Sequence, residues 1–548
     1  MTNSKIYILC LLIILICSLL IRVYYLDFPF CSNDEALHQQ FVIDSIPTNI
    51  NSFFNFNNYG IGNPLRILVS IISITYDFFL LLYISLISLL KIPITETVWR
   101  LPIIIIGVIN IALIYYFMRF FVNKKYSLIT AAFFAIFPLH VGWSRSLANI
   151  MLFSLTIQLF ALIFFMKYME TSKKKFMLLS SIFLALFILT DNFFPQFIVI
   201  LCFIFLIYNK KMFESVTNFK KAFFRLFNWR FFFFPCLALI TQLSVFVIIG
   251  LMGIKDVGTN AGMIGHILAK PKYFGIHLFP VIESLWDIIN PFLFFFIIIM
   301  IIFGIRSFIK LKKSSILLFA GLIYALPFFF FLNPSTVNIK VYAFTSVVFF
   351  IMFSFFVLSK IKVKSYIKTL LLVVLFITTF ISLFPKIYGI PEVDGGSLGY
   401  GGNLGDCGVK ALGYWFRTNT AENTKVMVIH GFGIGPVNGK YYFHRKIYGI
   451  FGNKKMEDFF IENIKDVDYI IVLPENQGMI ALLNENKFNL VRTLKLSDKK
   501  IFFIFSKIKM NHEVIDISKY NELYDKKFNK ITDYLNAPLY VADSPAYI

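Results

Sequence analysis

Charged residues are scarce in this sequence, and acidic residues are scarcer than basic ones. Only 15% of the 548 residues are charged, with 30 Asp and Glu against 52 Lys and Arg, whereas 58% are hydrophobic. Soluble domains carry roughly 25% charged residues, so this composition excludes a soluble globular protein. A net charge of +22 would favour nucleic-acid binding in a soluble chain. Here the basic residues stand in short loops between apolar runs, so we expect no nucleic-acid partner.

Cysteine motifs, internal repeats and nucleotide-binding loops are also missing. The six cysteines show no CxxC or other metal-ligand spacing, and four of them lie within apolar runs. No Gly-rich loop of the nucleotide-binding type is found. We therefore expect no metal centre and no cofactor. The sequence leaves open one divalent cation, at the acidic pair described below.

Apolar runs of about twenty residues recur from the N-terminus to about residue 388, and each can cross a hydrocarbon layer of roughly 30 Å. They predict a polytopic α-helical membrane protein with about 11–13 transmembrane helices over residues 1–388. From Lys124 onward every second loop is basic, and such loops stay cytoplasmic. This pattern predicts a cytoplasmic N-terminus and an outer location for everything after Tyr388. We expect a prokaryotic inner or plasma membrane.

The front of the chain does not fit a simple alternation of crossings. If residues 6–24 cross outward, the polar segment 25–64 lies outside. Three further crossings would then place the loop at Val141 inside, whereas the alternation of basic loops places it outside. One run must therefore not cross, or must cross twice. The run 65–90 is the candidate, because Arg66, Thr75 and Asp77 interrupt it.

The composition changes after Pro391. Residues 389–510 begin with a Gly-rich stretch and then contain two short buried strands, at 425–430 and 467–473. Residues 490–505 alternate around Ser497 and Asp498, which predicts a hairpin. We expect a small α/β domain on the outer face, followed by a tail, 511–548, that is a candidate amphipathic helix. His430, His444 and Arg445 of this domain are expected to have ordinary surface roles.

The acidic pair Asp34-Glu35 follows the first apolar run, which is unusual in a chain so poor in acids. One reading is a solvated pair at a helix N-terminus, where carboxylates suit the helix dipole. The other is a functional carboxylate, either a general base that takes a proton from an attacking hydroxyl or a ligand of a cation.

Two later segments occur in a familiar order after this pair. The helix opening Val-Trp-Arg-Leu-Pro-Ile stands at 98–103, and Ala-Ala-Phe-Phe-Ala-Ile-Phe-Pro-Leu-His-Val-Gly-Trp-Ser-Arg-Ser stands at 131–146. With many further helices and a terminal outer domain, this order resembles the GT-C glycosyltransferases of family 39 type, the protein O-mannosyltransferases and lipid A aminoarabinose transferases. The resemblance is best over the first 170 residues.

The resemblance implies a hexosyl- or pentosyltransferase that takes a sugar from a polyprenyl-phosphate donor in the membrane lipid. It implies Asp34 as the general base that deprotonates the hydroxyl of an acceptor of unknown identity, with Glu35 shaping the site. Similar enzymes often carry an acidic residue where this chain has Asn149, so an acidic role there is in doubt.

A lipid-phosphate leaving group requires cationic partners. The outer loops offer Arg100 and Arg145, which could equally snorkel to the membrane surface or anchor the interface. The segment 253–281 offers His266, Lys270 and Lys272, for which plain solvation is the alternative. Lys340 with Tyr342 matches a basic residue and an aromatic that similar enzymes place at the start of a late helix.

Two other functions remain open from the sequence. A transporter or lipid flippase is one, although such proteins usually show internal repeats. The other is an assembly subunit of an envelope-polysaccharide system. His140, within the second quoted segment, is expected to be a polar residue of the bundle interior rather than a metal ligand.

Overall fold

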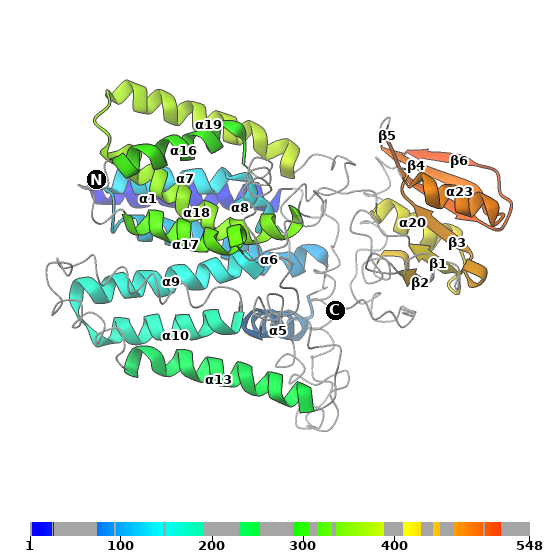
Figure 1. Ribbon diagram of the computed structural model, residues 1–548, viewed down its shortest axis with the longest axis horizontal. Coiled ribbons are helices and arrows are strands. Elements are labelled where there is room, and N and C mark those ends of the chain that lie inside the picture. The colour runs from blue at the N-terminus through cyan, green and yellow to red at the C-terminus, as the bar shows by residue number, and fades with distance from the viewer. Residues whose placement is uncertain are drawn as a thin grey trace.

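The computed structural model describes the two parts of the chain that the sequence predicts. The described residues are 3–24, 26, 74–92, 95–145, 150–190, 229–251, 289–306, 315–330, 336–387, 409–428, 442–449, 464–474, 476–496 and 499–516. A bundle of long helices and a smaller domain lie next to each other along the long axis (Figure 1). We call the bundle end nearer the smaller domain the domain-facing end.

The bundle consists of apolar helices that run side by side along the long axis (Figure 1). Its described helices are α1 (Asn3–Val23), α5 (Ile74–Leu89), α6 (Glu96–Met118), α7 (Lys124–Ile136), α8 (Pro138–Trp143), α9 (Ile150–Thr171), α10 (Lys174–Thr190), α13 (Trp229–Leu251), α16 (Pro291–Arg306), α17 (Ser315–Phe330), α18 (Thr336–Lys360) and α19 (Ser365–Ile387). Within the described residues, four helices are long and apolar enough to cross a membrane: Lys5–Val23, Glu96–Met118, Ile150–Thr171 and Ser365–Leu383. The protein is a polytopic α-helical membrane protein, as predicted.

The helices differ in how much of their surface faces other helices. Only 17% of the apolar window of α1 and of α19 is buried, against 78% for α9. Along α1 the exposed side chains are large and aliphatic, such as Ile8, Leu12 and Leu20. Because exposed aliphatic surface of this extent is stable only in lipid, α1 and α19 form the lipid-facing flank and α9 the interior.

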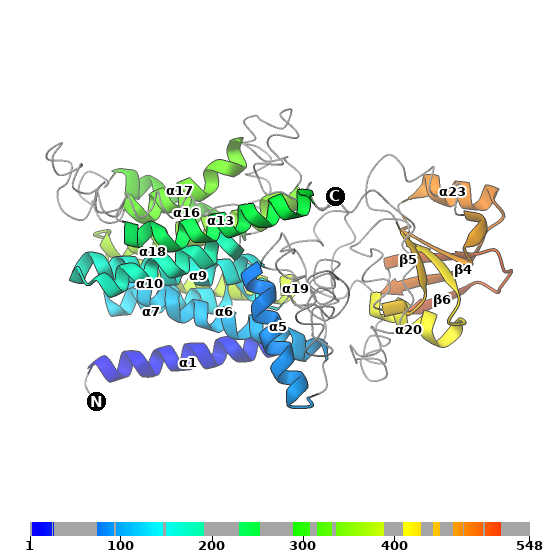
Figure 2. The ribbon, with the colours of Figure 1, turned by 90° about the horizontal axis from the view of Figure 1, so that it is seen from below.

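Helix α5 is oriented differently from its neighbours. Figures 1 and 2 both show it lying across the domain-facing end instead of along the bundle. The Tyr83 hydroxyl of α5 donates to the carbonyl of Val98 in α6, at 2.7 Å. That carbonyl lies four residues before Pro102, which has no N–H to offer it, so α5 satisfies a group that the proline leaves open. Helix α5, the described part of the run 65–90, thus lies across the bundle, an orientation that fits a run that does not cross the membrane.

The smaller domain is built on one mixed sheet in the order β2-β1-β3-β5-β4-β6. Its strands are β1 (Lys425–Val428), β2 (Lys446–Gly449), β3 (Tyr469–Val472), β4 (Asn489–Leu496), β5 (Lys499–Ser506) and β6 (Glu513–Asp516). Strand β1 pairs in parallel with β2 and β3, β5 is antiparallel to β3 and β4, and β6 is parallel to β4. The predicted strands and the hairpin are confirmed. Strands β2 and β6 were not predicted. Because β6 pairs with β4, the sheet extends past the predicted boundary at 510, and residues 513–516 are a strand instead of part of an amphipathic helix.

Helices cover both faces of this sheet (Figure 2). In β3, Tyr469 and Ile471 belong to the apolar cluster that includes α20 (Val409–Asn419). Ile470 and Val472 belong to the cluster of α23 (Gln477–Glu485). Since alternate residues of a strand point to opposite faces, the four-residue apolar run Tyr469–Val472 is that of a strand buried on both sides.

The expectation of a surface role for Arg445 is wrong. Its side chain is 4% exposed and donates to the carbonyls of Phe416 and Thr420, at 3.0 and 2.7 Å, and to the Thr420 hydroxyl. The final carbonyls of a helix have no partner within the helix. Arg445 therefore caps the C-terminal end of α20 and ties it to β2.

Close packing between α17 and α18 gives a stability prediction. A Cβ atom at Gly321 would lie 2.6 Å from Cδ1 of Phe350, and the Gly321 carbonyl accepts a hydrogen bond from the Ser346 hydroxyl at 2.8 Å. We expect Gly321→Leu to destabilise the bundle by about 1–3 kcal/mol through overpacking, measured as a lower Tm in detergent. Leu322→Phe is the control, because Leu322 is exposed. Equal melting temperatures for the two variants would contradict the packing.

Candidate functional site

Three arginines are fully buried at the domain-facing end of the apolar bundle. Arg22, Arg100 and Arg145 are each 0% exposed. Charged side chains at the level of membrane helices are expensive to bury, and they are accordingly found in pairs or on backbone carbonyls and mark functional regions. This end of the bundle is therefore the candidate site.

Two of these arginines hold the end of α1. The Arg145 guanidinium donates to the carbonyl of Tyr24 at 2.7 Å, and that of Arg100 donates to the carbonyl of Leu26 at 3.0 Å. Both carbonyls lie just beyond Val23, the last residue of α1. The negative end of the helix dipole is near, so cationic donors suit this position. The two guanidinium groups therefore fix the chain where it leaves α1, eight residues before Asp34.

The third arginine joins α1 to α7 and α8. Arg22 donates to the carbonyl of Ala135 at 3.1 Å, and its Nη2 lies 2.7 Å from Nδ1 of His140. Since a guanidinium can only donate, Nδ1 of His140 accepts and the ring is neutral with its proton on Nε2. Helix α6 approaches closely here, because a Cβ at Gly107 would lie 3.2 Å from Nε of Arg22. His140 is thus a partner of Arg22 in the bundle interior, as expected.

A buried carboxylate stands at the beginning of α6. Thr95 is the N-cap, and its side chain accepts from the backbone N–H of Val98 at 3.3 Å. Glu96 follows in the first turn, where a negative charge suits the helix dipole, and is 1% exposed. Its Oε2 lies 3.4 Å from Nη1 of Arg100, one turn later. Glu96 thus orients the same guanidinium that holds Leu26.

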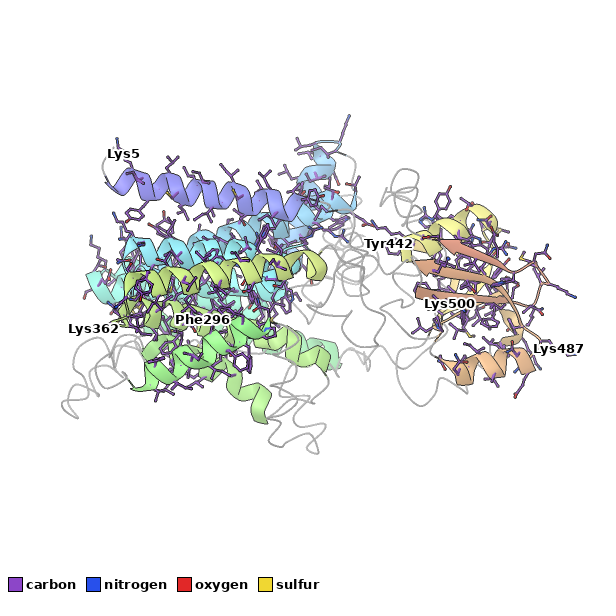
Figure 3. All side chains as sticks on the ribbon, turned by 90° about the horizontal axis from the view of Figure 1, so that it is seen from above. Lys5, Phe296, Lys362, Tyr442, Lys487 and Lys500 are labelled. Atoms are coloured by element: carbon purple, nitrogen blue, oxygen red, sulfur yellow. The ribbon has the colours of Figure 1, made fainter. Side chains whose placement is uncertain are left out.

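The smaller domain contacts this carboxylate directly. The ammonium of Lys410 in α20 lies 3.1 Å from Oε2 of Glu96, and the Tyr442 hydroxyl donates to Oε1 at 3.3 Å. Lys410 and Tyr442 are both 0% exposed. Figure 3 shows Tyr442 at the edge of the domain that faces the helices, and Lys487 at the far edge. We call Glu96, Arg100, Lys410 and Tyr442 the interdomain cluster.

The structure describes only part of the predicted site. Arg100 and Arg145 both bind carbonyls of the segment that follows α1 and are 0% exposed, so neither reaches water as a snorkelling side chain would. Their predicted role in donor binding stays a prediction. Asp34, Glu35, His266, Lys270 and Lys272 lie outside the described residues, as do the side chains of Lys340 and Tyr342 in α18. No group of three or more potential metal ligands occurs among the residues that the structure describes.

Sequence reasoning missed Arg22, Glu96 and Lys410. Arg22 ends an apolar run and Glu96 precedes Arg100 by four residues, so an i, i+4 ion pair was a visible signal. Nothing in the sequence connects Lys410 to Glu96.

The comparisons agree with this architecture. The family described as dolichyl-phosphate-mannose-protein mannosyltransferase matches residues 78–239, which include Arg100 and Arg145. The apo oligosaccharyltransferase of Archaeoglobus fulgidus superposes with a TM-score of 0.52 at 13% identity, over 93% of this chain and 75% of that one. ArnT from Cupriavidus metallidurans bound to undecaprenyl phosphate superposes with a TM-score of 0.52 at 10% identity, over 92% of this chain and 99% of that one. The chain has the GT-C glycosyltransferase fold. No curated protein matches its sequence.

The GT-C fold confirms the resemblance that the quoted segments carried. At 9–15% identity, the similar structures establish the fold of this chain and leave its reaction to be argued from its own residues.

The contact of Arg145 with the end of α1 can be tested by stability. We expect Arg145→Met to lower the free energy of unfolding by about 1–3 kcal/mol, because the buried guanidinium of Arg145 is the charged donor to the Tyr24 carbonyl and that hydrogen bond is lost. Thermal unfolding in detergent measures the loss. Arg119→Met removes the same charge from an exposed position just after α6 and is expected to melt like the wild type. Equal effects of the two changes would show that the contact with Tyr24 contributes nothing.

Proposed function

We propose that this protein is a membrane glycosyltransferase that moves a sugar from a polyprenyl-phosphate donor to a hydroxyl acceptor. The observation that carries the proposal is the family match over 78–239 in a chain with the GT-C fold. In that segment, two buried arginines hold the chain that leads into Asp34-Glu35. One of the similar structures has undecaprenyl phosphate bound, a lipid of the class proposed here.

The placement of charges supports an outer location for the site. Figure 3 shows Lys5 and Lys362 at the bundle end opposite to the smaller domain. Basic residues stay on the cytoplasmic side, so we assign that end to the cytoplasm. The domain-facing end then opens outward, where the donor headgroup and an acceptor from the aqueous side would meet.

The proposed reaction is a single displacement with inversion. Asp34 takes the proton of the acceptor hydroxyl while its oxygen attacks the anomeric carbon of the sugar. The bond from that carbon to the phosphate oxygen breaks, and polyprenyl phosphate leaves with the electron pair. Cations are needed where that charge develops. We assign this role to His266, Lys270, Lys272, Lys340 and Tyr342. Glu35 is assigned to the shape of the site.

Asp34 gives the sharpest test of the proposed reaction. We expect Asp34→Asn to lower the transfer rate by at least about 10²-fold, because a general base contributes typically 10²–10⁴-fold. The measurement is transfer of labelled sugar from a polyprenyl-phosphate donor by the purified protein. Asp44→Asn, in the same segment, is the matched control and should retain normal turnover. Near-normal turnover of Asp34→Asn in a folded protein would refute the assigned base.

The two lysines predict a loss of carrier binding. We expect Lys270→Ala/Lys272→Ala to weaken the affinity for polyprenyl phosphate by about tenfold or more, because hydrogen bonds to charged groups contribute about 1.5–3 kcal/mol. Titration in nanodiscs measures it. Lys312→Ala/Lys313→Ala removes the same charge from a loop assigned to the cytoplasm and should bind normally. Equal affinities of the two double variants would remove Lys270 and Lys272 from the donor site.

A further inference from the structure

Glu96 connects three parts of the chain that are far apart in the sequence. It begins α6, it pairs with Arg100, which holds the Leu26 carbonyl after α1, and it receives Lys410 and Tyr442 from the smaller domain. All four side chains of the interdomain cluster are 0–1% exposed. The contact between domain and bundle is therefore a buried ionic one, and not a solvated surface pair.

The domain presents Lys410 and Tyr442 as one unit. A Cβ at Gly413 would lie 2.6 Å from the Tyr442 carbonyl oxygen, so α20 packs directly on the Tyr442 segment. The apolar core is also continuous, since Trp99 of α6 and Leu412 and Tyr442 of the domain belong to one buried cluster. A rigid docking surface of this kind holds the domain in one place on the bundle.

We propose that Glu96 is a positioning residue through which the docked smaller domain fixes the chain leading into the acidic pair. The path is short: Lys410 and Tyr442 hold the Glu96 carboxylate, the carboxylate orients Arg100, and Arg100 holds Leu26. The domain thereby acts on the transfer site from outside it. The catalytic consequence rests on the proposed function, whereas the docking itself does not.

Breaking a buried ion pair is strongly unfavourable, because the remaining charge stays buried. Loss of Lys410 therefore loosens both sides of the contact, the domain side at 409–419 and the bundle side at 95–101. A lysine that served only the folding of α20 would loosen the domain side alone.

Amide hydrogen exchange of the full-length protein in nanodiscs distinguishes the two cases. We expect Lys410→Met to raise exchange about tenfold or more in both segments, because removing one partner of a buried pair opens the contact locally. Exchange in β4 and β5, which lie toward the edge of the sheet opposite to β2, stays as in the wild type. Lys500→Met, which removes an exposed lysine of the same domain, is the control and changes neither segment. Unchanged exchange at 95–101 in Lys410→Met overturns the proposal.

A second variant keeps the test decisive if Lys410→Met does not fold. Glu96→Gln preserves the shape of the side chain and removes its charge, and it is expected to raise exchange at 95–101 and 409–419 together. Where both single variants fold, the double variant Glu96→Gln/Lys410→Met should exchange no faster than the faster single one, because both changes break one interaction. Independent, additive effects, or a Glu96→Gln effect confined to α6, overturn the proposal.

Measurements of turnover test whether Glu96 affects catalysis. Glu96→Gln is expected to lower kcat for sugar transfer about tenfold while the affinity for polyprenyl phosphate stays within about twofold, since the residues assigned to donor binding are not members of the interdomain cluster. A weakened affinity with unchanged kcat contradicts a positioning role. If the wild type transfers no sugar, the proposed function fails, and the exchange measurement alone then decides whether the domain is locked through Glu96.

Discussion

The end of α1 imposes the constraint around which the domain-facing end is built. The chain leaves α1 after Val23, and the carbonyls of Tyr24 and Leu26 lie beyond the helical hydrogen-bond ladder. Arg145 and Arg100 supply the missing donors at Tyr24 and Leu26. A buried guanidinium also needs a negative partner, and Glu96 is that partner for Arg100. Through Arg100 and Glu96, the segment after α1 is connected to α6 and to the smaller domain.

Two groups of charged residues thus lie at opposite ends of the bundle. Lys5 and Lys362 lie at one end of the bundle (Figure 3). The buried charges Arg100, Glu96 and Lys410 are in contact where the bundle meets the smaller domain. Between them the helices are almost entirely apolar. A transfer reaction that uses a donor already in the membrane suits this division, because the lipid part of the donor needs only apolar surface while its phosphate needs cations at one end.

Features set by local pattern could be predicted from the sequence. The apolar runs predicted the membrane helices, and the alternation around Ser497 predicted the hairpin of β4 and β5. In each case the signal lies within about twenty neighbouring residues, as periodicity arguments require.

Features set by distant contacts could not be predicted. Glu96 and Lys410 lie 314 residues apart, and only the docking of the domain brings them together. Arg445 resembles a surface residue in sequence, yet it is buried because the end of α20 needs a cap. Strand β2 is a four-residue edge strand whose identity comes from its partner β1. The same limit applies to Arg100 and Arg145, whose pairing with the end of α1 depends on how three helices pack.

The central claim is that the protein holds a phosphate-bearing polyprenyl carrier. The most direct measurement is titration of the wild-type protein in nanodiscs with polyprenyl phosphate and, in parallel, with the corresponding polyprenol, which lacks the phosphate. The account predicts saturable binding of the phosphate form, with affinity falling as salt rises, and at least about tenfold weaker binding of the alcohol. Equal binding of the two lipids, or no saturable binding of either, would contradict it.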